Sequence, residues 1–183
     1  DRSPDENDQS VIKAAENIMA QALPEVFERF AEGAARVTKK DLDALLGSED
    51  LRGLPAVFTQ LKLLGNEGGS VVFVTDSGPL GEMLTWINNK SDYGINPTGK
   101  ALEAEFGGIP YGWDVDVIKL FALSLLRSGQ VTVTSQGVTI ESVVDLGAID
   151  AFTNNTKFRA CTFRPKKVLD FAEIVKAGAA FEQ

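Results

Sequence analysis

Apolar residues are most concentrated between Gly107 and Ile140, over the sequence GGIPYGWDVDVIKLFALSLLRSGQVTVTSQGVTI. This pattern predicts a tight aromatic loop, a helix over Asp114–Ser128 and a β-hairpin over Gln130–Ile140. The apolar positions of the helix are Val115, Val117, Ile118, Leu120, Phe121, Ala122, Leu123, Leu125 and Leu126. Because they leave almost no polar side, we expect this helix to be buried.

The loop before this helix has a structural interpretation. It consists of Pro110, Tyr111, Gly112, Trp113 and Asp114. The Asp114 carboxylate is suited to accept hydrogen bonds from the first free backbone N–H groups of the helix. Trp113 is placed to pack on Ile118 as a hydrophobic staple. An exposed stacking pair of Tyr111 and Trp113 is the alternative, which we favour less because the cap and staple already explain the pattern.

The first third of the chain predicts mostly helices. Asp1–Ser10 is acidic, lacks apolar residues and is expected to be a disordered lead-in. A helical repeat follows, interrupted at Pro24, where we expect a kink or a junction between two helices. Its apolar positions are Ile12, Ala15, Met19, Leu23, Val26, Phe27 and Phe30. Thr38 and Asp41 have the spacing of a capping box and open a short helix through Leu46.

The centre of the chain predicts a winged helix. The expected elements are a helix over Leu54–Leu64, a buried strand over Val71–Thr75, a helix over Pro79–Asn89 and a helix from Asn96-Pro97 to Phe106. The last two helices, the apolar helix and the hairpin follow one another in the order of a winged helix, in which the hairpin is the wing.

The C-terminal part predicts a short helix over Asp145–Phe152, a strand over Lys157–Arg164 and a terminal helix from Pro165. The fold class is therefore α+β, mostly helical with a winged-helix-like unit and a small β component. We expect the parts to be residues 1–10, a helical part with one strand over 11–93, the winged-helix-like unit over 94–140, and a strand and helix over 141–183.

Composition excludes several functions. The chain of 183 residues has no histidine, which removes Ser-His-Asp and Cys-His catalysis and the usual zinc ligand sets. The passage VTDSGPLGEM lacks the spacing of a phosphate-binding loop, so it is best interpreted as a plain helix start. We therefore expect no enzyme activity, no cofactor, no metal and no catalytic residue in this chain.

Charge and cysteine content indicate where the protein resides and what it binds. The single cysteine, and the lack of a signal peptide or a long apolar run, favour a cytoplasmic protein that binds no membrane. A chain that starts with Asp1 and not with methionine is expected to be a processed protein or a fragment of a longer one, of which we favour the fragment. The net charge of −8 argues against a global surface for DNA, although not against a local one.

The apolar helix is poorly suited to enter a major groove. It begins Asp114-Val115-Asp116 and carries only Lys119 and Arg127 as cations. Acidic residues at the end that reads bases would repel phosphates. A winged helix used for packing or protein contact is the better interpretation.

One local basic stretch opposes the global charge. It consists of Lys157, Arg159, Arg164, Lys166 and Lys167, with no acid between its ends. On a strand, Lys157 and Arg159 would share a face that could bind a nucleic-acid backbone or an acidic partner. The alternative is a set of charges that protects an edge strand from aggregation.

Two segments carry a family resemblance. The two segments are ALPEVFERFAEGAARVTKKDLDALL and FGGIPYGWDVDVIKLFALSLLRSGQVTV. They resemble the large P-loop proteins of BREX phage-defence systems, of the BrxC/PglY type. The resemblance spans Ala22 to Phe163, and its most specific part is the Pro110–Trp113 loop with the apolar helix that ends at Gly129.

The resemblance implies a multidomain ATPase whose Walker motifs lie outside this chain, so no ATP-binding residue is transferred to it. It further implies an accessory region that assembles with other subunits or domains of a defence complex. The alternative function is a nucleic-acid contact through the basic stretch.

Overall fold

The computed structural model describes residues 11, 13 and 25–166. Four predicted features lie outside these residues: the lead-in, most of the helix from Val11, Lys167 and most of the terminal helix.

The helices are the 3-10 turn η1 (Phe30–Gly33), α2 (Lys39–Gly47), α3 (Ala56–Gln60), α4 (Gly78–Asp92), α5 (Gly99–Phe106), α6 (Val115–Arg127), α7 (Ala148–Thr153) and α8 (Asn155–Ala160). The strands are β1 (Leu64–Glu67), β2 (Ser70–Phe73), β3 (Val131–Ser135), β4 (Val138–Ile140) and β5 (Thr162–Pro165).

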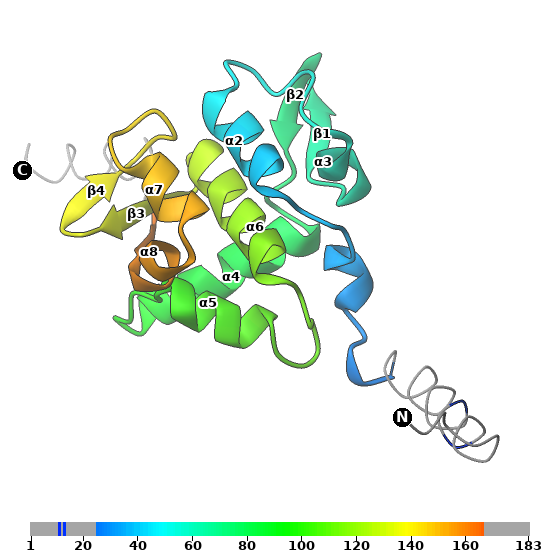
Figure 1. The fold of residues 1–183 in the computed structure, drawn as a ribbon. Helices are drawn as coiled ribbons and strands as arrows, with labels where there is room; N and C mark the ends of the chain where they lie inside the picture. The colour runs from blue at the N-terminus through cyan, green and yellow to red at the C-terminus, as the bar shows by residue number, and fades with distance from the viewer. Residues whose placement is uncertain (1–10, 12, 14–24, 167–183) are drawn as a thin grey trace, which may run out of the picture.

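Helix α6 is the centre of the fold, as its apolar pattern predicted. Its N-cap is Asp114, whose carboxylate accepts a hydrogen bond of 2.8 Å from the Asp116 amide. Every residue from Val117 to Leu126 is buried. Figure 1 shows α6 in the middle of the molecule, with α2 on one side and α4 and α5 on the other. The packing therefore surrounds a helix that has no polar face to expose.

The wing is a three-stranded antiparallel sheet in the order β4-β3-β5. Strands β3 and β4 form the expected hairpin, and its two turn residues, Gln136 and Gly137, both have positive φ angles. Such a turn matches the twist of the flanking strands. Strand β5 pairs with β3 from Thr162 to Pro165 and gives the wing a third strand.

The first half of the strand expected over Lys157–Arg164 is a helix, so that part of the prediction was wrong. Asn154 caps a helix by accepting a 3.0 Å hydrogen bond from the Lys157 amide, so the chain is helical through Ala160. The helix points Phe158 into the core, where it packs between Phe152 and Phe163. Only the part from Thr162 onward is a strand. Alternating apolar residues over so few positions fit either structure, and the asparagine cap decides between them.

Several boundaries also differ from the predictions. Helix α5 starts after Thr98, whose hydroxyl accepts from the Ala101 amide at 3.2 Å, and not after Asn96. The Pro97 carbonyl instead accepts a 2.8 Å hydrogen bond from the Phe163 amide beside β5. Helix α3 is shorter than expected. The capping box is confirmed, with the Thr38 amide 2.8 Å from the Asp41 carboxylate.

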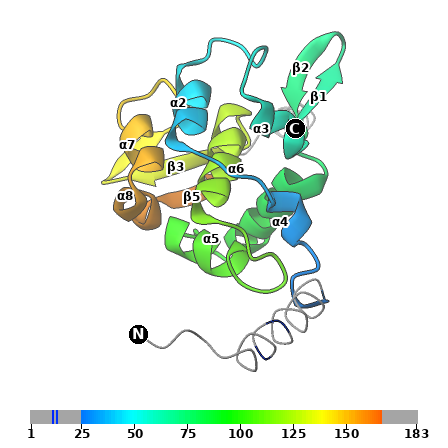
Figure 2. The same ribbon diagram turned by 45° about the vertical axis from the view of Figure 1, so that its right-hand side comes forward.

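The hairpin β1-β2 was only partly predicted. Strand β2 overlaps the expected strand, but β1 was not anticipated. Within residues 25–166 the two strands pair only with each other, and they project beside α3 (Figures 1 and 2). Val71 and Val72 are consequently half-buried and Phe73 alone in β2 is fully buried, so the expectation of a buried strand was wrong.

Candidate interaction surfaces of the winged helix

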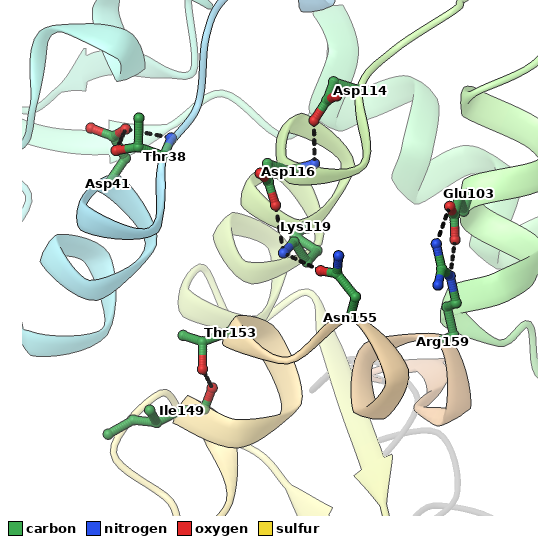
Figure 3. A network of polar contacts seen from close by, with 10 residues as sticks. All are labelled: Thr38, Asp41, Glu103, Asp114, Asp116, Lys119, Ile149, Thr153, Asn155 and Arg159. Atoms are coloured by element: carbon green, nitrogen blue, oxygen red, sulfur yellow. Dashed lines mark hydrogen bonds and ion pairs between the residues drawn. The ribbon is translucent and has the colours of Figure 1, made fainter.

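Both cations of α6 are bound by the chain itself. Lys119 is only 3% exposed. Its ammonium lies 2.5 Å from the Asp116 carboxylate and donates to the Asn155 side-chain oxygen at 2.8 Å (Figure 3). Arg127 donates to the carbonyl oxygens of Ser48 at 2.7 Å and Glu49 at 2.9 Å. Helix α6 therefore presents neither cation to a groove of DNA.

The basic stretch is largely paired with carboxylates. Lys157 contacts Asp150 at 2.5 Å. Arg159 forms a two-pronged pair with Glu103 on α5, at 2.6 and 2.8 Å (Figure 3). The hydrogen bonds from Arg159 lower the pKa of the Glu103 carboxyl below its usual value. Lys166 lies 3.5 Å from a third acid, Glu141. These pairs neutralise most of the local positive charge.

The structure brings only part of this stretch together. Lys157 and Arg159 are two residues apart on α8, so they point in different directions. Arg164 and Lys166 line one open hollow of about 620 Å³, whose lining also includes the acids Asp92 and Glu141. No carboxylate within residues 25–166 forms an ion pair with Arg164. Lys167 lies outside the described residues.

The aromatic loop is a packing element. Trp113 is buried and stacks on Phe106 with ring centres 5.3 Å apart, while its edge meets Phe121 at 5.1 Å. The alternative of an exposed stacking pair was therefore wrong. Tyr111 is partly buried, and this burial raises the pKa of its hydroxyl. The expected staple on Ile118 stays a prediction.

A contact that the sequence did not reveal holds this loop. The Arg29 amide donates to the Pro110 carbonyl at 3.1 Å, and the Trp113 indole donates to the Arg29 carbonyl at 3.0 Å. The Arg29 guanidinium lies 2.7 Å from Glu82 on α4. The hydrogen bond to Glu82 raises the pKa of Arg29. No periodicity marks this role of Arg29, since Glu82, Pro110 and Trp113 are 53 or more residues away.

An apolar surface lies after the wing. In the segment that joins β4 to α7, Val144 and Leu146 are exposed, and Leu146 is 92% exposed. Ile149 in the first turn of α7 is also exposed. Exposed large apolar side chains that gather in one short segment are typical of contact surfaces. We call these three residues the loop surface.

The comparison with known families identifies the central part of the chain. Residues 77–166 match the winged helix-turn-helix domain of the BREX ATP-binding protein BrxC. The chain carries a BrxC-type winged helix-turn-helix domain. The match confirms the resemblance over these residues and the α+β fold class, and the part of the expected resemblance from Ala22 to residue 76 stays a prediction. The BrxC-type domain runs from the start of α4 through β5 and so includes α6, the wing and the loop surface.

Other comparisons and searches gave negative results. No curated protein and no solved structure is significantly similar to the chain. Across residues 25–166, no cluster of three or more acidic or cysteine side chains has the arrangement of a metal site. In the same part of the chain, no helix has both the length and the apolar character needed to cross a membrane.

Proposed function

We propose that this chain is a non-catalytic interaction module of a BREX ATPase, and that it binds protein subunits of the defence complex. The observation that carries the proposal is the burial of α6 from Val117 to Leu126. In DNA-binding winged helices, this position holds the helix that enters the major groove. A helix enclosed on all sides by its own fold is unsuited to that role.

The loop surface supports a protein partner. Leu146 and Ile149 expose apolar side chains to solvent, next to a wing whose edge strand β4 is only three residues long. Apolar side chains at the centre of an interface contribute most of its binding free energy, whereas charged residues are depleted there. The net charge of −8 also favours a protein partner over nucleic acid.

The test is co-elution of the chain with the purified remaining subunits of its BREX complex in size-exclusion chromatography. We expect the double variant Leu146→Asp, Ile149→Asp to lose co-elution while it keeps the thermal unfolding transition of the wild type. The matched control is the double variant Thr59→Asp, Asn66→Asp in α3 and β1, two exposed residues given the same two new charges. Co-elution of the double variant at wild-type affinity would contradict the loop surface as the contact.

A second candidate function is nucleic-acid contact through the basic stretch, and the hollow beside Arg164 and Lys166 favours it. The test is fluorescence anisotropy of duplex DNA at low and near-physiological salt, with the double variant Arg164→Glu, Lys166→Glu beside the wild type. The second function requires binding that falls steeply with salt and disappears in the variant. Assembly through protein contacts predicts no such binding by either chain.

A further inference from the structure

The aromatic loop carries a bound peptide segment supplied by the same chain. We call residues 25–33 the strap; it lies beside α4 and the loop between α5 and α6 (Figure 2). Both main-chain groups of Arg29 in the strap are paired with the loop, its amide with the Pro110 carbonyl and its carbonyl with the Trp113 indole. The strap is a turn that continues into η1, and it is held both through its backbone and through the side chain of Arg29.

The site has the chemistry that recognises arginine. The Arg29 guanidinium pairs with Glu82 at 2.7 Å and lies 5.5 Å from the centre of the Tyr111 ring. The Tyr111 hydroxyl donates to the same Glu82 carboxylate at 3.3 Å, which orients it. Glu32, within the strap itself, contacts the guanidinium on another side. A carboxylate next to an aromatic face satisfies both the charge and the flat shape of a guanidinium.

The strap and the site fit closely. A Cβ atom on Gly33 would lie 2.4 Å from Trp113 Cδ1, and one on Gly112 would lie 2.7 Å from the Phe27 ring. Both distances are shorter than the van der Waals contact of two carbon atoms. A side chain at either glycine would therefore separate the strap from the loop. The site is therefore shaped for a turn that has a glycine four residues after its arginine.

The strap itself is only partly buried. Val26 and Phe30 are 40% and 49% exposed, although both are large apolar residues. The strap has few buried apolar contacts, and segments of this kind open at a lower free energy than the core does. Arg29 therefore supplies much of the attachment.

We propose that Glu82, Tyr111 and Trp113 form a receptor for an arginine-bearing turn of a protein partner, and that the strap occupies this receptor in the unbound chain. The partner segment carries arginine beside apolar residues, as the strap does in EVFERFAEG. Displacement of the strap then links partner binding to the chain that precedes residue 25. This inference rests on the proposed function, because it names one contact of the assembly module.

The experiment measures binding of a fluorescent peptide with the sequence of residues 25–36, EVFERFAEGAAR, to the whole chain by anisotropy. Two variants open the strap by different means. Arg29→Glu places a like charge beside Glu82, and Gly33→Ala introduces a Cβ against Trp113. We expect each to bind the peptide at least roughly tenfold more tightly than the wild type, whose receptor is occupied.

Two controls identify the site. Glu82→Gln in the Gly33→Ala chain should weaken peptide binding roughly tenfold, since a hydrogen bond between charged groups is lost. Arg36→Glu, which makes the same charge change as Arg29→Glu outside the strap, should bind the peptide no better than the wild type. Circular dichroism verifies that every variant is folded.

Absence of peptide binding to both opened variants would overturn the inference, and so would binding that Glu82→Gln leaves unchanged. No defence subunit is present in this assay. Failure of the peptide assay therefore does not contradict the assembly function. Failure of the co-elution test does not contradict a receptor that the peptide assay has measured.

Discussion

Helix α6 and the segment formed by α8 and β5 make opposite use of their charged residues. In α6, Lys119 lies inside the fold and contacts Asp116 and Asn155. In α8 and β5, Arg159 and Arg164 lie at the surface. Helix α6 has the position of a DNA-reading helix but does not expose the cationic side chains that such a helix uses. The segment formed by α8 and β5 has cations, but most of them are paired with carboxylates.

The comparison teaches that place in a topology does not determine what a helix does. The order of elements is that of a winged helix, yet the side chains of α6 are used to build the core. Which chemistry reaches the surface decides whether such a fold binds nucleic acid or protein. Substitutions at three residues sharpen this contrast, and we describe them from the largest expected effect to the smallest.

Phe121→Ala should have the largest effect. Phe121 is fully buried in α6 and meets the edge of Trp113 at 5.1 Å. Removing a buried phenyl ring leaves a cavity and costs about 3–5 kcal/mol of unfolding free energy. Urea unfolding followed by circular dichroism measures this cost. A loss below about 1 kcal/mol would show that α6 is not the core of the fold.

Lys119 distinguishes a structural cation from one that binds DNA. Lys119→Ala should reduce the unfolding free energy by about 1–3 kcal/mol, because it leaves Asp116 and Asn155 without their partner. Lys119→Met keeps the apolar stem and should cost less. Thermal unfolding of both variants checks this order. Wild-type stability of Lys119→Ala, together with weaker DNA binding, would reverse our interpretation of α6.

Glu103→Gln should have the smallest effect and depends on pH. Arg159 lowers the pKa of Glu103 in the folded chain. The pair therefore adds stability at pH values above the pKa of glutamate in the unfolded chain, about 4.3. This added stability is lost as the pH falls through the lower pKa of the folded chain. The wild type should be slightly more stable than the variant near pH 7, and the difference should vanish in strong acid. Added salt should shrink it as well. Unfolding curves across pH measure this, and a difference that grows in acid would contradict it.

The sequence predicted the elements whose signals are local. The apolar repeat of α6, the Asp114 cap and the Thr38 capping box each lie within a few residues, and the structure confirms them. The order of helices and hairpin was sufficient to predict the winged helix, which the family match supports.

Features that depend on distant partners were missed. The strand expected over Lys157–Arg164 is helix in its first half, because burial of Phe158 against Phe152 and Phe163 stabilises α8. The contact of Arg29 with Pro110 and Trp113 joins segments about 80 residues apart, and no repeat in the sequence encodes such a pairing.

The third strand of the wing has a consequence for synthesis of the chain on the ribosome. Strand β5 pairs with β3 about 30 residues earlier, and its Phe163 amide bonds to Pro97 earlier still. Until β5 has left the exit tunnel, the hydrogen-bonding groups of Thr132 and Thr134 form an open sheet edge, which other nascent chains can pair with. The domain therefore completes its fold only when its last strand emerges.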